Sequence, residues 1–461
     1  MDYKKLFTEK KITVMGLGLL GRGVGDTIFL AEHGAELIVT DLRDEKTLAP
    51  SLAKLKKYKN IKYTLGHHNL EDFKNRDFII KAAGVPLDSI YIAEARKNKI
   101  PVEMDASFFV KLMPEGVTIV GVTGTRGKST TTALVYELVK SFKLKVKSKN
   151  RVFKGGNLVA EATLPLLEKV KTGDIVVLEL DSWQLQGFHD ANLPAGEAGI
   201  SPQVAVFTTF LDDHLIYYKG DTDRYFEDKT AIFKYQKNEN ILIAGKRVAE
   251  LIGKSEVPVN GDFVVATKED VPKDWAISIP GEHNLENIAC AIKVAEYFKI
   301  PVATVRKAVE KFEGVAGRLE YLRTAGGVKI YNDTNATTPD ATIAGLRALT
   351  KQKNIVLIMG GTDKGLDMSK LVEEIPKHCK GVILLAEVGT EKFKKQIVGQ
   401  ELGITIKEKE TLKECVAEAM KIAKKGDIVL FSPAFASFGK WFKNEYDRGE
   451  QFAEIVRKLK G

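Results

Sequence analysis

The stretch V-G-V-T-G-T-R-G-K-S-T-T-T, from Val120 to Thr132, decides the fold of the middle part of the chain. A β-branched run over residues 116–122 is typical of a buried strand, and apolar residues recur at helical spacing from residue 130 to residue 142. A glycine-rich turn between a strand and a helix points backbone N–H groups outward at the positive end of the helix dipole. The stretch therefore predicts a cradle for phosphate oxygens.

Side chains in this turn favour a nucleoside triphosphate as the ligand. Lys128 adds a cation for the outer phosphates, and the hydroxyl group of Ser129 or Thr130 can hold Mg²⁺. The usual spacing would have a glycine at Val122, so Gly124 is the inner glycine of a variant pattern. A loop that uses Gly-Lys-Ser only to begin a helix is the plain alternative. The order of strand, loop and helix favours the nucleotide site.

The opening segment K-I-T-V-M-G-L-G-L-L-G-R-G, residues 11–23, predicts a second phosphate site. A strand runs into Gly16, Gly18 and Gly21, and the next strand ends at Asp41. This is the dinucleotide fingerprint, with a tight turn at a helix start and an acid for a ribose or base. The fingerprint indicates a diphosphate but not a nicotinamide, so any nucleoside diphosphate is a candidate ligand. The region continues as alternating strands and helices to about residue 110.

Two later strands of the middle part end in residues that bind metals well. The run V-V-L-E-L carries Glu179 and is followed by Asp181, and the next apolar run ends at Asp212, Asp213 and His214. Carboxyl ends of parallel strands are where α/β sheets bind ligands, so these side chains are placed to complete a Mg²⁺ site. A solvated acid and a structural histidine are the plain alternatives.

Lys229 is the most unusual residue of the chain. A helix predicted over residues 223–235 places it in an apolar stripe between Tyr225 and Phe233. Most lysines in such stripes extend their amine to water. A desolvated lysine has a lowered pKa and becomes a nucleophile, for example toward CO₂, giving a carbamate that binds metal.

Composition describes an ordinary globular chain of 461 residues, 44% hydrophobic and 28% charged, with a net charge of +9. This length predicts two to four domains. The basic residues are scattered and lack interleaved aromatics, so we expect a lysine-rich surface and no nucleic-acid partner. Three distant cysteines predict neither a disulfide framework nor a zinc site. We find no signal segment or membrane-spanning run and expect a cytoplasmic monomer without a membrane partner.

Taken together, these motifs resemble the Mur ligase family over nearly the whole chain. T-G-T-R-G-K-S-T-T at 123–131 resembles the ATP loop of that family, and L-E-L-D-S-W-Q at 178–184 resembles its Glu-x-x-Ser-aromatic-Gln strand. D-D-H at 212–214 and Lys229 resemble its metal-binding histidine and carbamoylated lysine.

Two later motifs extend the resemblance. G-E-H-N-L-E-N at 281–287 is similar to the family motif beside the nucleotide. G-R-L-E at 317–320 resembles the family segment whose arginine meets the terminal phosphate. The resemblance implies an α/β protein of three domains. These are a Rossmann-like domain at 1–110 for a UDP-linked substrate, a central P-loop ATPase-type domain at 111–314 for ATP, and a Rossmann-like domain at 315–461 for an amino acid.

The C-terminal third resembles the family members that add D-glutamate to UDP-N-acetylmuramoyl-L-alanine for peptidoglycan synthesis. The similar stretches are Y-N-D-T-N-A-T-T-P-D-A-T at 331–342, G-G-T-D-K at 360–364 and S-P-A-F-A-S-F at 432–438. The resemblance implies an ATP-dependent amide ligase that forms an acyl phosphate and releases ADP and phosphate.

The resemblance also implies roles for single residues. The residues expected to act in catalysis are Lys128, His214, Lys229 and Arg318. Those expected to bind ATP are Gly124, Thr125, Arg126, Gly127, Lys128, Ser129, Thr130, Asn284, Arg318 and Asp333. Two Mg²⁺ ions are expected at Ser129, Glu179, His214 and Lys229, the last as its carbamate. The UDP-linked substrate is expected at Gly18, Leu19, Leu20, Asp41, Leu42, Arg43, Gly84, Asn157 and Gln184. D-Glutamate is expected at Thr337, Lys364, Ser437 and Phe438.

Some positions depart from the family pattern. Asp181 replaces the usual serine, Thr209 replaces an asparagine, and Asn335 and Thr338 replace a lysine and an asparagine of the D-glutamate motif. A related ligase that attaches a different amino acid is therefore an alternative. An NAD-dependent oxidoreductase would use the first fingerprint but not Lys128 or Lys229. A nucleotide-binding switch without catalysis would not need Glu179, His214 and Lys229 together.

Overall fold

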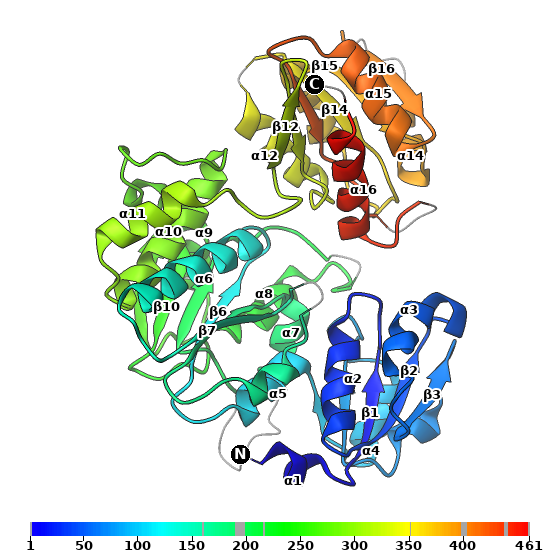
Figure 1. Cartoon of the computed structure of the whole chain (residues 1–461), viewed down its shortest axis with the longest axis vertical. Coiled ribbons are helices and arrows are strands. Elements are labelled where there is room, and N and C mark those ends of the chain that lie inside the picture. The colour runs from blue at the N-terminus through cyan, green and yellow to red at the C-terminus, as the bar shows by residue number, and fades with distance from the viewer. Residues whose placement is uncertain are drawn as a thin grey trace. The chain divides into compact units, whose positions relative to one another are not determined.

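The computed structural model in Figure 1 describes residues 2–158, 161–189, 199–214, 217–350, 352–397, 403–437 and 441–459. The chain forms two compact units. One contains Met1–Lys273 and Glu286–Ala308, and the other contains Asp274–Leu285 and Val309–Gly461. The first unit holds two sheets and the second holds one.

The first sheet has five parallel strands in the order β3-β2-β1-β4-β5. Its strands are β1 Lys11–Met15, β2 Glu36–Asp41, β3 Ile61–Leu65, β4 Phe78–Lys81 and β5 Val102–Glu103. The neighbouring helices are α1 Tyr3–Phe7, α2 Arg22–Glu32, α3 Glu45–Leu55, η1 Leu70–Phe73, α4 Ile90–Lys97 and α5 Asp105–Leu112. Because β1 lies between β2 and β4, the loops after these three strands meet at one edge of the sheet.

The second sheet has six parallel strands in the order β11-β10-β9-β6-β8-β7. Its strands are β6 Thr118–Thr123, β7 Val152–Gly156, β8 Ile175–Glu179, β9 Val204–Phe207, β10 Ile241–Gly245 and β11 Asp262–Ala266. The helical segments are α6 Lys128–Lys145, η2 Leu164–Glu168, α7 Ser182–Gln186, α8 Thr222–Thr230, α9 Lys246–Ile252, η3 Lys268–Asp270, α10 Glu282–Tyr297 and α11 Val302–Lys311. The strands beside β6 are buried on both faces, as their continuous apolar sequences predict.

The third sheet also has six strands, in the order β12-β13-β17-β14-β15-β16. Strand β12 runs antiparallel to β13 and the remaining pairs are parallel. The strands are β12 Glu320–Ala325, β13 Val328–Asn332, β14 Ile355–Met359, β15 Cys379–Leu385, β16 Thr405–Lys409 and β17 Ile428–Phe431. The helices are α12 Pro339–Leu349, α13 Ser369–His378, α14 Val388–Ile397, α15 Leu412–Ile422 and α16 Glu445–Arg457.

The predicted fold class is confirmed, because three mostly parallel sheets alternate with helices along the chain. The predicted domain boundaries at residues 110 and 314 stay a prediction. In the described part of the chain, no helix is both long and apolar enough to span a lipid bilayer.

Two predicted elements are shorter than expected. The helix predicted over 223–235 begins at Thr222 and ends at Thr230, after which tighter turns replace the helical bonding, as in the bond from the Phe233 N–H to the Thr230 carbonyl at 2.9 Å. The apolar run before Asp212 forms a strand only to Phe207. Of the residues that follow, Thr208, Thr209 and Leu211 instead contact the ATP-loop candidate, for example through the Thr209 hydroxyl and the Leu211 N–H.

Candidate active site

The loop between β6 and α6 depends on two glycines with positive φ. Gly124 has φ of 146°, and a Cβ atom there would lie 2.1 Å from the Thr208 hydroxyl oxygen. Gly127 has φ of 87° and caps α6, and its Cβ would lie 2.2 Å from the Asn287 side-chain oxygen. Any larger residue would push the loop open. The loop thus turns into the first turn of α6, whose backbone N–H groups lack helical acceptors.

Two lysines that the sequence singled out lie at this loop. The Lys128 ammonium donates to the carbonyls of Gly124 at 2.9 Å and Thr125 at 3.2 Å. The Lys229 ammonium, from α8, donates to the same Gly124 carbonyl at 3.2 Å. The two amines therefore share one acceptor although 101 positions separate them in the sequence. The fold brings the phosphate-binding loop and the carbamate candidate together.

Lys229 is only 1% exposed, so the plain alternative, in which its amine extends to water, is contradicted. The ammonium lies 4.9 Å from the centre of the Tyr225 ring, and that tyrosine is itself buried. Burial, and next the Lys128 charge, hold the pKa of Lys229 well below its usual value. A lowered pKa favours the neutral amine, which is the form that reacts with CO₂.

His214 joins the same cluster from the loop after β9. Its backbone is left-handed, with φ of 55°, and its N–H donates to the Asp213 carboxylate at 2.9 Å. Its ring packs 4.6 Å from the Trp183 ring. Burial lowers the pKa of His214, the Asp213 carboxylate opposes the shift, and the nearby Lys128 charge adds to it. The lowered pKa favours the neutral imidazole, which is the metal-binding form.

Glu179 ends β8, which pairs directly with β6, so that Glu179 lies opposite Val122 at the start of the ATP-loop candidate. The side chain is 3% exposed, and its Oε2 atom has no hydrogen-bond partner among the described residues. Burying a carboxylate oxygen without a partner is costly, and a bound cation removes that cost. This orphan atom is the observation that fits a Mg²⁺ ion at the site.

The donor set differs from an ordinary acidic metal site. Across the described residues no group of three or more His, Cys, Asp or Glu side chains could hold a metal ion. The predicted ligands include only two residues of those types, Glu179 and His214, beside the Ser129 hydroxyl and the Lys229 amine. A carbamate on Lys229 would supply the missing anionic oxygens.

The departure at Asp181 has a structural explanation. Its carboxylate caps α7 by accepting the Gln184 N–H at 2.7 Å, and the Gln184 side chain accepts the Asp181 N–H in return. A serine could cap in the same way. The Gln184 Nε2 and the Trp183 indole nitrogen are buried without a hydrogen-bond partner in the described structure. Both are donors available to a ligand.

The first glycine-rich loop is organised by Asp41. This buried carboxylate accepts the N–H groups of Gly18 at 3.0 Å and Arg43 at 2.9 Å. It therefore joins the loop after β1 to the loop after β2, while Leu42 between them is 67% exposed. Leu19 and Leu20 continue the first of these loops.

Segments that connect the strands of the two sheets of the first unit contact each other beside this loop. Arg22, the first residue of α2, donates to the Asn157 side chain at 2.8 Å, and the Asn157 N–H donates to the Glu179 carbonyl at 2.7 Å. Gly84, after β4, approaches Trp183, whose ring would lie 3.9 Å from a Cβ at that glycine. The candidate residues of the two phosphate sites are thus linked by direct contacts.

Arg22 is not among the site residues predicted from the sequence. A cation in the first turn of a helix, where the dipole disfavours it, was the available signal.

The second unit assembles the predicted amino-acid site from three loops. The Lys364 ammonium donates to the Thr337 hydroxyl at 3.0 Å. The Ser437 hydroxyl donates to Glu445 at 3.3 Å. Phe438 lies outside the described residues.

Three predicted ATP residues also belong to this unit. Asp333 is buried and accepts the Leu319 N–H at 3.0 Å and the Ser432 hydroxyl at 2.9 Å, so it fixes the turn that carries Arg318. The Asn284 side chain donates to the Pro280 carbonyl at 2.7 Å. Asp333 and Asn284 therefore each make a hydrogen bond within this unit. The contacts of these residues with ATP stay predictions.

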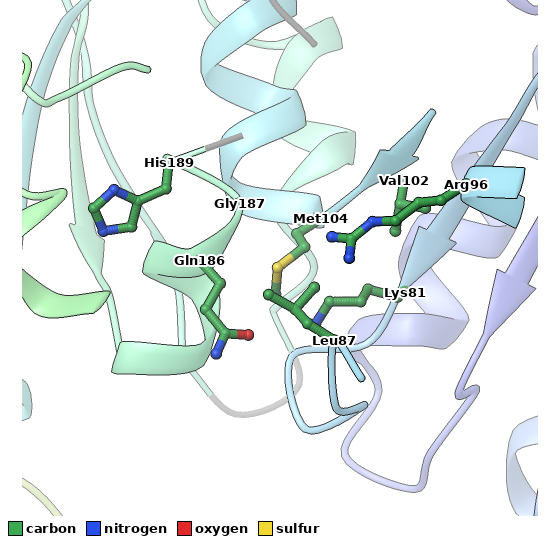
Figure 2. Close-up of a pocket in the computed structure, with 8 residues that line it drawn as sticks. All are labelled: Lys81, Leu87, Arg96, Val102, Met104, Gln186, Gly187 and His189. Carbon is green, nitrogen blue, oxygen red and sulfur yellow. The ribbon is translucent and has the colours of Figure 1, made fainter. Parts of the chain in front are cut away.

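A cavity of about 240 Å³ lies between β4 and the end of α7 (Figure 2). It is lined by Lys81, Leu87, Arg96, Val102, Met104, Gln186, Gly187 and His189. Lys81 is 1% exposed and donates to the carbonyl of Val85 at 3.0 Å and that of Ala83 at 3.4 Å. Burial lowers the pKa of Lys81 to about 8. None of the predicted site residues lines this cavity. Lys81 shapes the loop that carries Gly84.

Comparison with protein families places the chain in a known class. Residues 10–103 match the Mur ligase MurD-like N-terminal domain, residues 122–260 match the Mur ligase middle domain, and residues 317–435 match the Mur ligase glutamate ligase domain. The chain belongs to the Mur ligase family.

The similar curated proteins carry a more particular name. A UDP-N-acetylmuramoylalanine--D-glutamate ligase from Roseiflexus sp. (strain RS-1) is 35% identical, over 97% of this chain and 98% of that protein. A protein of the same name from Borreliella afzelii (strain PKo) is 34% identical, over 97% of both chains.

Solved structures show the same fold at lower identity. The UDP-N-acetylmuramate-alanine ligase MurC of Thermotoga maritima has a TM-score of 0.61 at 19% identity, covering 97% of this chain and 99% of that one. The MurF ligase of Thermotoga maritima in complex with ADP has a TM-score of 0.57 at 21% identity, covering 99% and 96%.

Proposed function

We propose that the protein is an ATP-dependent ligase that joins D-glutamate to UDP-N-acetylmuramoyl-L-alanine, releasing ADP and phosphate, in peptidoglycan precursor synthesis. The observation that carries the proposal is the gathering of Lys128, Glu179, His214 and Lys229 around one phosphate-binding loop. The similarity to ligases of this name over 97% of the chain supports the choice of substrates.

Activation of the substrate's carboxylate takes place at the loop between β6 and α6. The backbone N–H groups from Gly127 to Thr130 bind the phosphates of ATP. The N–H groups of Thr125 and Arg126 donate to Thr209 and so hold the loop in shape. Lys128 then leaves the Gly124 and Thr125 carbonyls and moves its ammonium to the terminal phosphate. Arg318 supplies a second cation there. These charges stabilise the phosphoryl group as it moves to the carboxylate, giving an acyl phosphate and ADP.

Two Mg²⁺ ions are part of the proposal. Ser129 and Glu179 would hold one, and His214 with a carbamate on Lys229 would hold the other. The carbamate would form when the neutral Lys229 amine bonds to the carbon of CO₂ and loses a proton. The positive charge of bound Mg²⁺ would offset the negative charge of the crowded phosphate and carboxylate oxygens. Burial keeps water away from the carbamate, whose stability depends on that exclusion.

Amide formation requires a second substrate beside the acyl phosphate. Thr337, Lys364 and Ser437, together with Phe438, bind the carboxylates of D-glutamate. The free amine of D-glutamate attacks the acyl carbon, the C–N bond forms, and phosphate leaves with the electron pair of the broken C–O bond. Asn284 and Asp333 hold the nucleotide during this step.

The UDP-linked substrate binds along the first sheet. The diphosphate lies at the loop from Gly18 to Leu20, and the uridine lies between Gly84 and the segment Asp41–Arg43. Asn157 and Gln184 follow the muramoyl arm toward the ATP loop. The contact of Arg22 with Asn157 supports a path from one phosphate site to the other.

A ligase for a different amino acid is the second candidate. Asn335 occupies the position of a family lysine, and its side chain donates to the Ala316 carbonyl at 3.4 Å and carries no charge to offer a carboxylate.

One assay tests both candidates. ADP release is measured with UDP-N-acetylmuramoyl-L-alanine, ATP and a panel of amino acids that includes D- and L-glutamate. We expect release that depends on D-glutamate and a product heavier by one glutamyl residue. Release with another amino acid alone would favour the second candidate. No release under any condition would contradict both.

A further inference from the structure

Arg448 occupies a position where a charged side chain costs free energy. It is 0% exposed and belongs to the first turn of α16, at the positive end of the helix dipole. No carboxylate of the described residues is within ion-pair distance of its guanidinium group, although Glu445 and Glu387 act on it from farther away. Burial lowers the pKa of Arg448 to about 10, so it remains a cation at neutral pH. An apolar side chain of similar length would fill this space without these costs.

The bonds of Arg448 explain why an arginine is present. Its Nη2 donates to the Thr334 carbonyl at 2.8 Å and its Nε to the Thr334 hydroxyl at 3.2 Å. Its Nη1 donates to the carbonyls of Phe435 at 3.2 Å and Ala436 at 3.3 Å. All four bonds end on two loops, one after β13 and one after β17. A planar group with five donors can hold two loops at a fixed separation, whereas a lysine cannot.

A third loop is attached to the same point. Ala436 pairs with Thr362 through two backbone hydrogen bonds, of 3.0 and 3.1 Å. The Ala436 carbonyl thus accepts from both Arg448 and Thr362. Gly361 is required beside it, because a Cβ there would lie 2.4 Å from that carbonyl oxygen. Strands β13, β17 and β14 are neighbours in the sheet, so the three loops share one edge.

These three loops carry the residues expected to bind the amino acid. Thr337 follows Thr334 by three positions, Lys364 follows Thr362 by two, and Ser437 follows Ala436 directly. We propose that Arg448 is a positioning residue for the incoming amino acid, which holds the loops 333–337, 360–364 and 433–437 in the arrangement that binds its carboxylates. The inference rests on the proposed function, because that function assigns these loops to the amino acid.

The test compares the KM values of the three substrates in each variant. Arg448→Met fills the same space without donors. We expect it to raise the KM for D-glutamate on the order of 10- to 100-fold, because displaced binding groups lose affinity steeply. The KM for UDP-N-acetylmuramoyl-L-alanine should stay within about twofold of wild type, since none of the residues expected to bind it lies in these loops. The KM for ATP should change less than the KM for D-glutamate, because Asp333 is the one residue of these loops that is expected to contact ATP. Arg448→Lys keeps the charge but reaches fewer acceptors, so an intermediate KM is expected.

A matched control separates positioning from stability. Val456→Ala lies on the same helix, at a fully buried position away from the loops. It should lower the melting temperature and leave the KM for D-glutamate unchanged. Thr334→Val removes one acceptor of Arg448 with little change of volume, and it provides the measurement if the Arg448 variants do not fold. We expect a several-fold rise of the same KM.

Two results would overturn the inference. One is a KM for D-glutamate within about twofold of wild type in Arg448→Met, or in Thr334→Val where that variant alone folds. The other is a parallel rise of all three KM values. Failure of the proposed function is recognised separately, because wild type would then show no release of ADP that depends on D-glutamate. The variants are in that case measured with the amino acid that wild type accepts.

Discussion

The ATP loop and the amino-acid loops are built in opposite ways. The ATP loop is one continuous stretch between β6 and α6, and its shape follows from Gly124 and Gly127. The amino-acid loops follow three strands spread over about a hundred positions, and they meet through tertiary hydrogen bonds, among them those of Arg448, the Thr362–Ala436 pairing and the Lys364–Thr337 bond. A local motif can be recognised letter by letter. A site that is assembled by tertiary contacts has no such signature.

The difference predicts different responses to substitution. A change in the ATP loop removes a group that acts on the reacting phosphate. A change in the amino-acid loops shifts groups that bind one substrate. The first kind should lower kcat, and the second kind should raise a single KM.

Lys128→Ala should have the largest effect. It removes the cation expected at the transferred phosphoryl group, and we expect kcat to fall roughly 10³-fold. The fold should be retained, because this ammonium donates to carbonyls of its own loop. ADP release measured with saturating substrates checks the prediction. Turnover near the wild-type rate would show that the loop does not act on the phosphate.

Lys229→Ala should also abolish ligation, with a loss of about 10²-fold or more in kcat. Added bicarbonate should not restore activity, because the amine that takes up CO₂ is gone. Lys234→Ala is the matched control, since Lys234 lies five residues further along the same segment and is not buried. It should behave as wild type. A Lys229 variant with normal activity would refute the carbamate.

Lys364→Met should act on one substrate only. We expect the KM for D-glutamate to rise about tenfold or more, because a charged hydrogen bond to a carboxylate is lost. The KM for ATP should not change. Kinetic measurements at fixed saturating ATP check this, and a fall in kcat without any change of KM would contradict the contrast between the two regions.

Asp181→Ala should have the smallest effect. Loss of the cap of α7 should lower the free energy of unfolding by about 1 kcal/mol. Asp181→Ser restores both a capping oxygen and the residue usual in the family, so its unfolding free energy should equal that of wild type. Denaturant unfolding compares the three proteins. If both variants lose the same free energy of unfolding, Asp181 stabilises the site by its charge and not as a cap.

Much of the fold could be predicted from the sequence. Strands such as β6, β8 and β14 are continuous apolar runs, and the helices after glycine-rich turns begin where the motifs place them. The polar strands β12 and β16 were missed, because β16 lies at an edge of its sheet and β12 pairs only with β13. An edge strand needs no apolar face on both sides, so its sequence resembles that of a loop.

The candidate site could be predicted in part. Lys128, Glu179, His214 and Lys229 were found from spacing and resemblance, and the structure gathers them at one loop. Arg22 and Arg448 were not found, because each donates to oxygens of loops that are distant in the sequence. Lys81 was not found because its burial depends on tertiary packing, although the carbonyls that it contacts, those of Ala83 and Val85, lie in the loop that follows it.

The sequence by itself determined the α/β class, the family and the two glycine-rich phosphate loops, since these depend on local periodicity and on backbone angles that only glycine adopts easily. The tertiary structure decided that Lys229 is buried and shares an acceptor with Lys128, and that Arg448 joins three loops. Burial and long-range hydrogen bonds depend on which elements become neighbours in space. That information is spread over the whole chain and is expressed only when the sheets have formed.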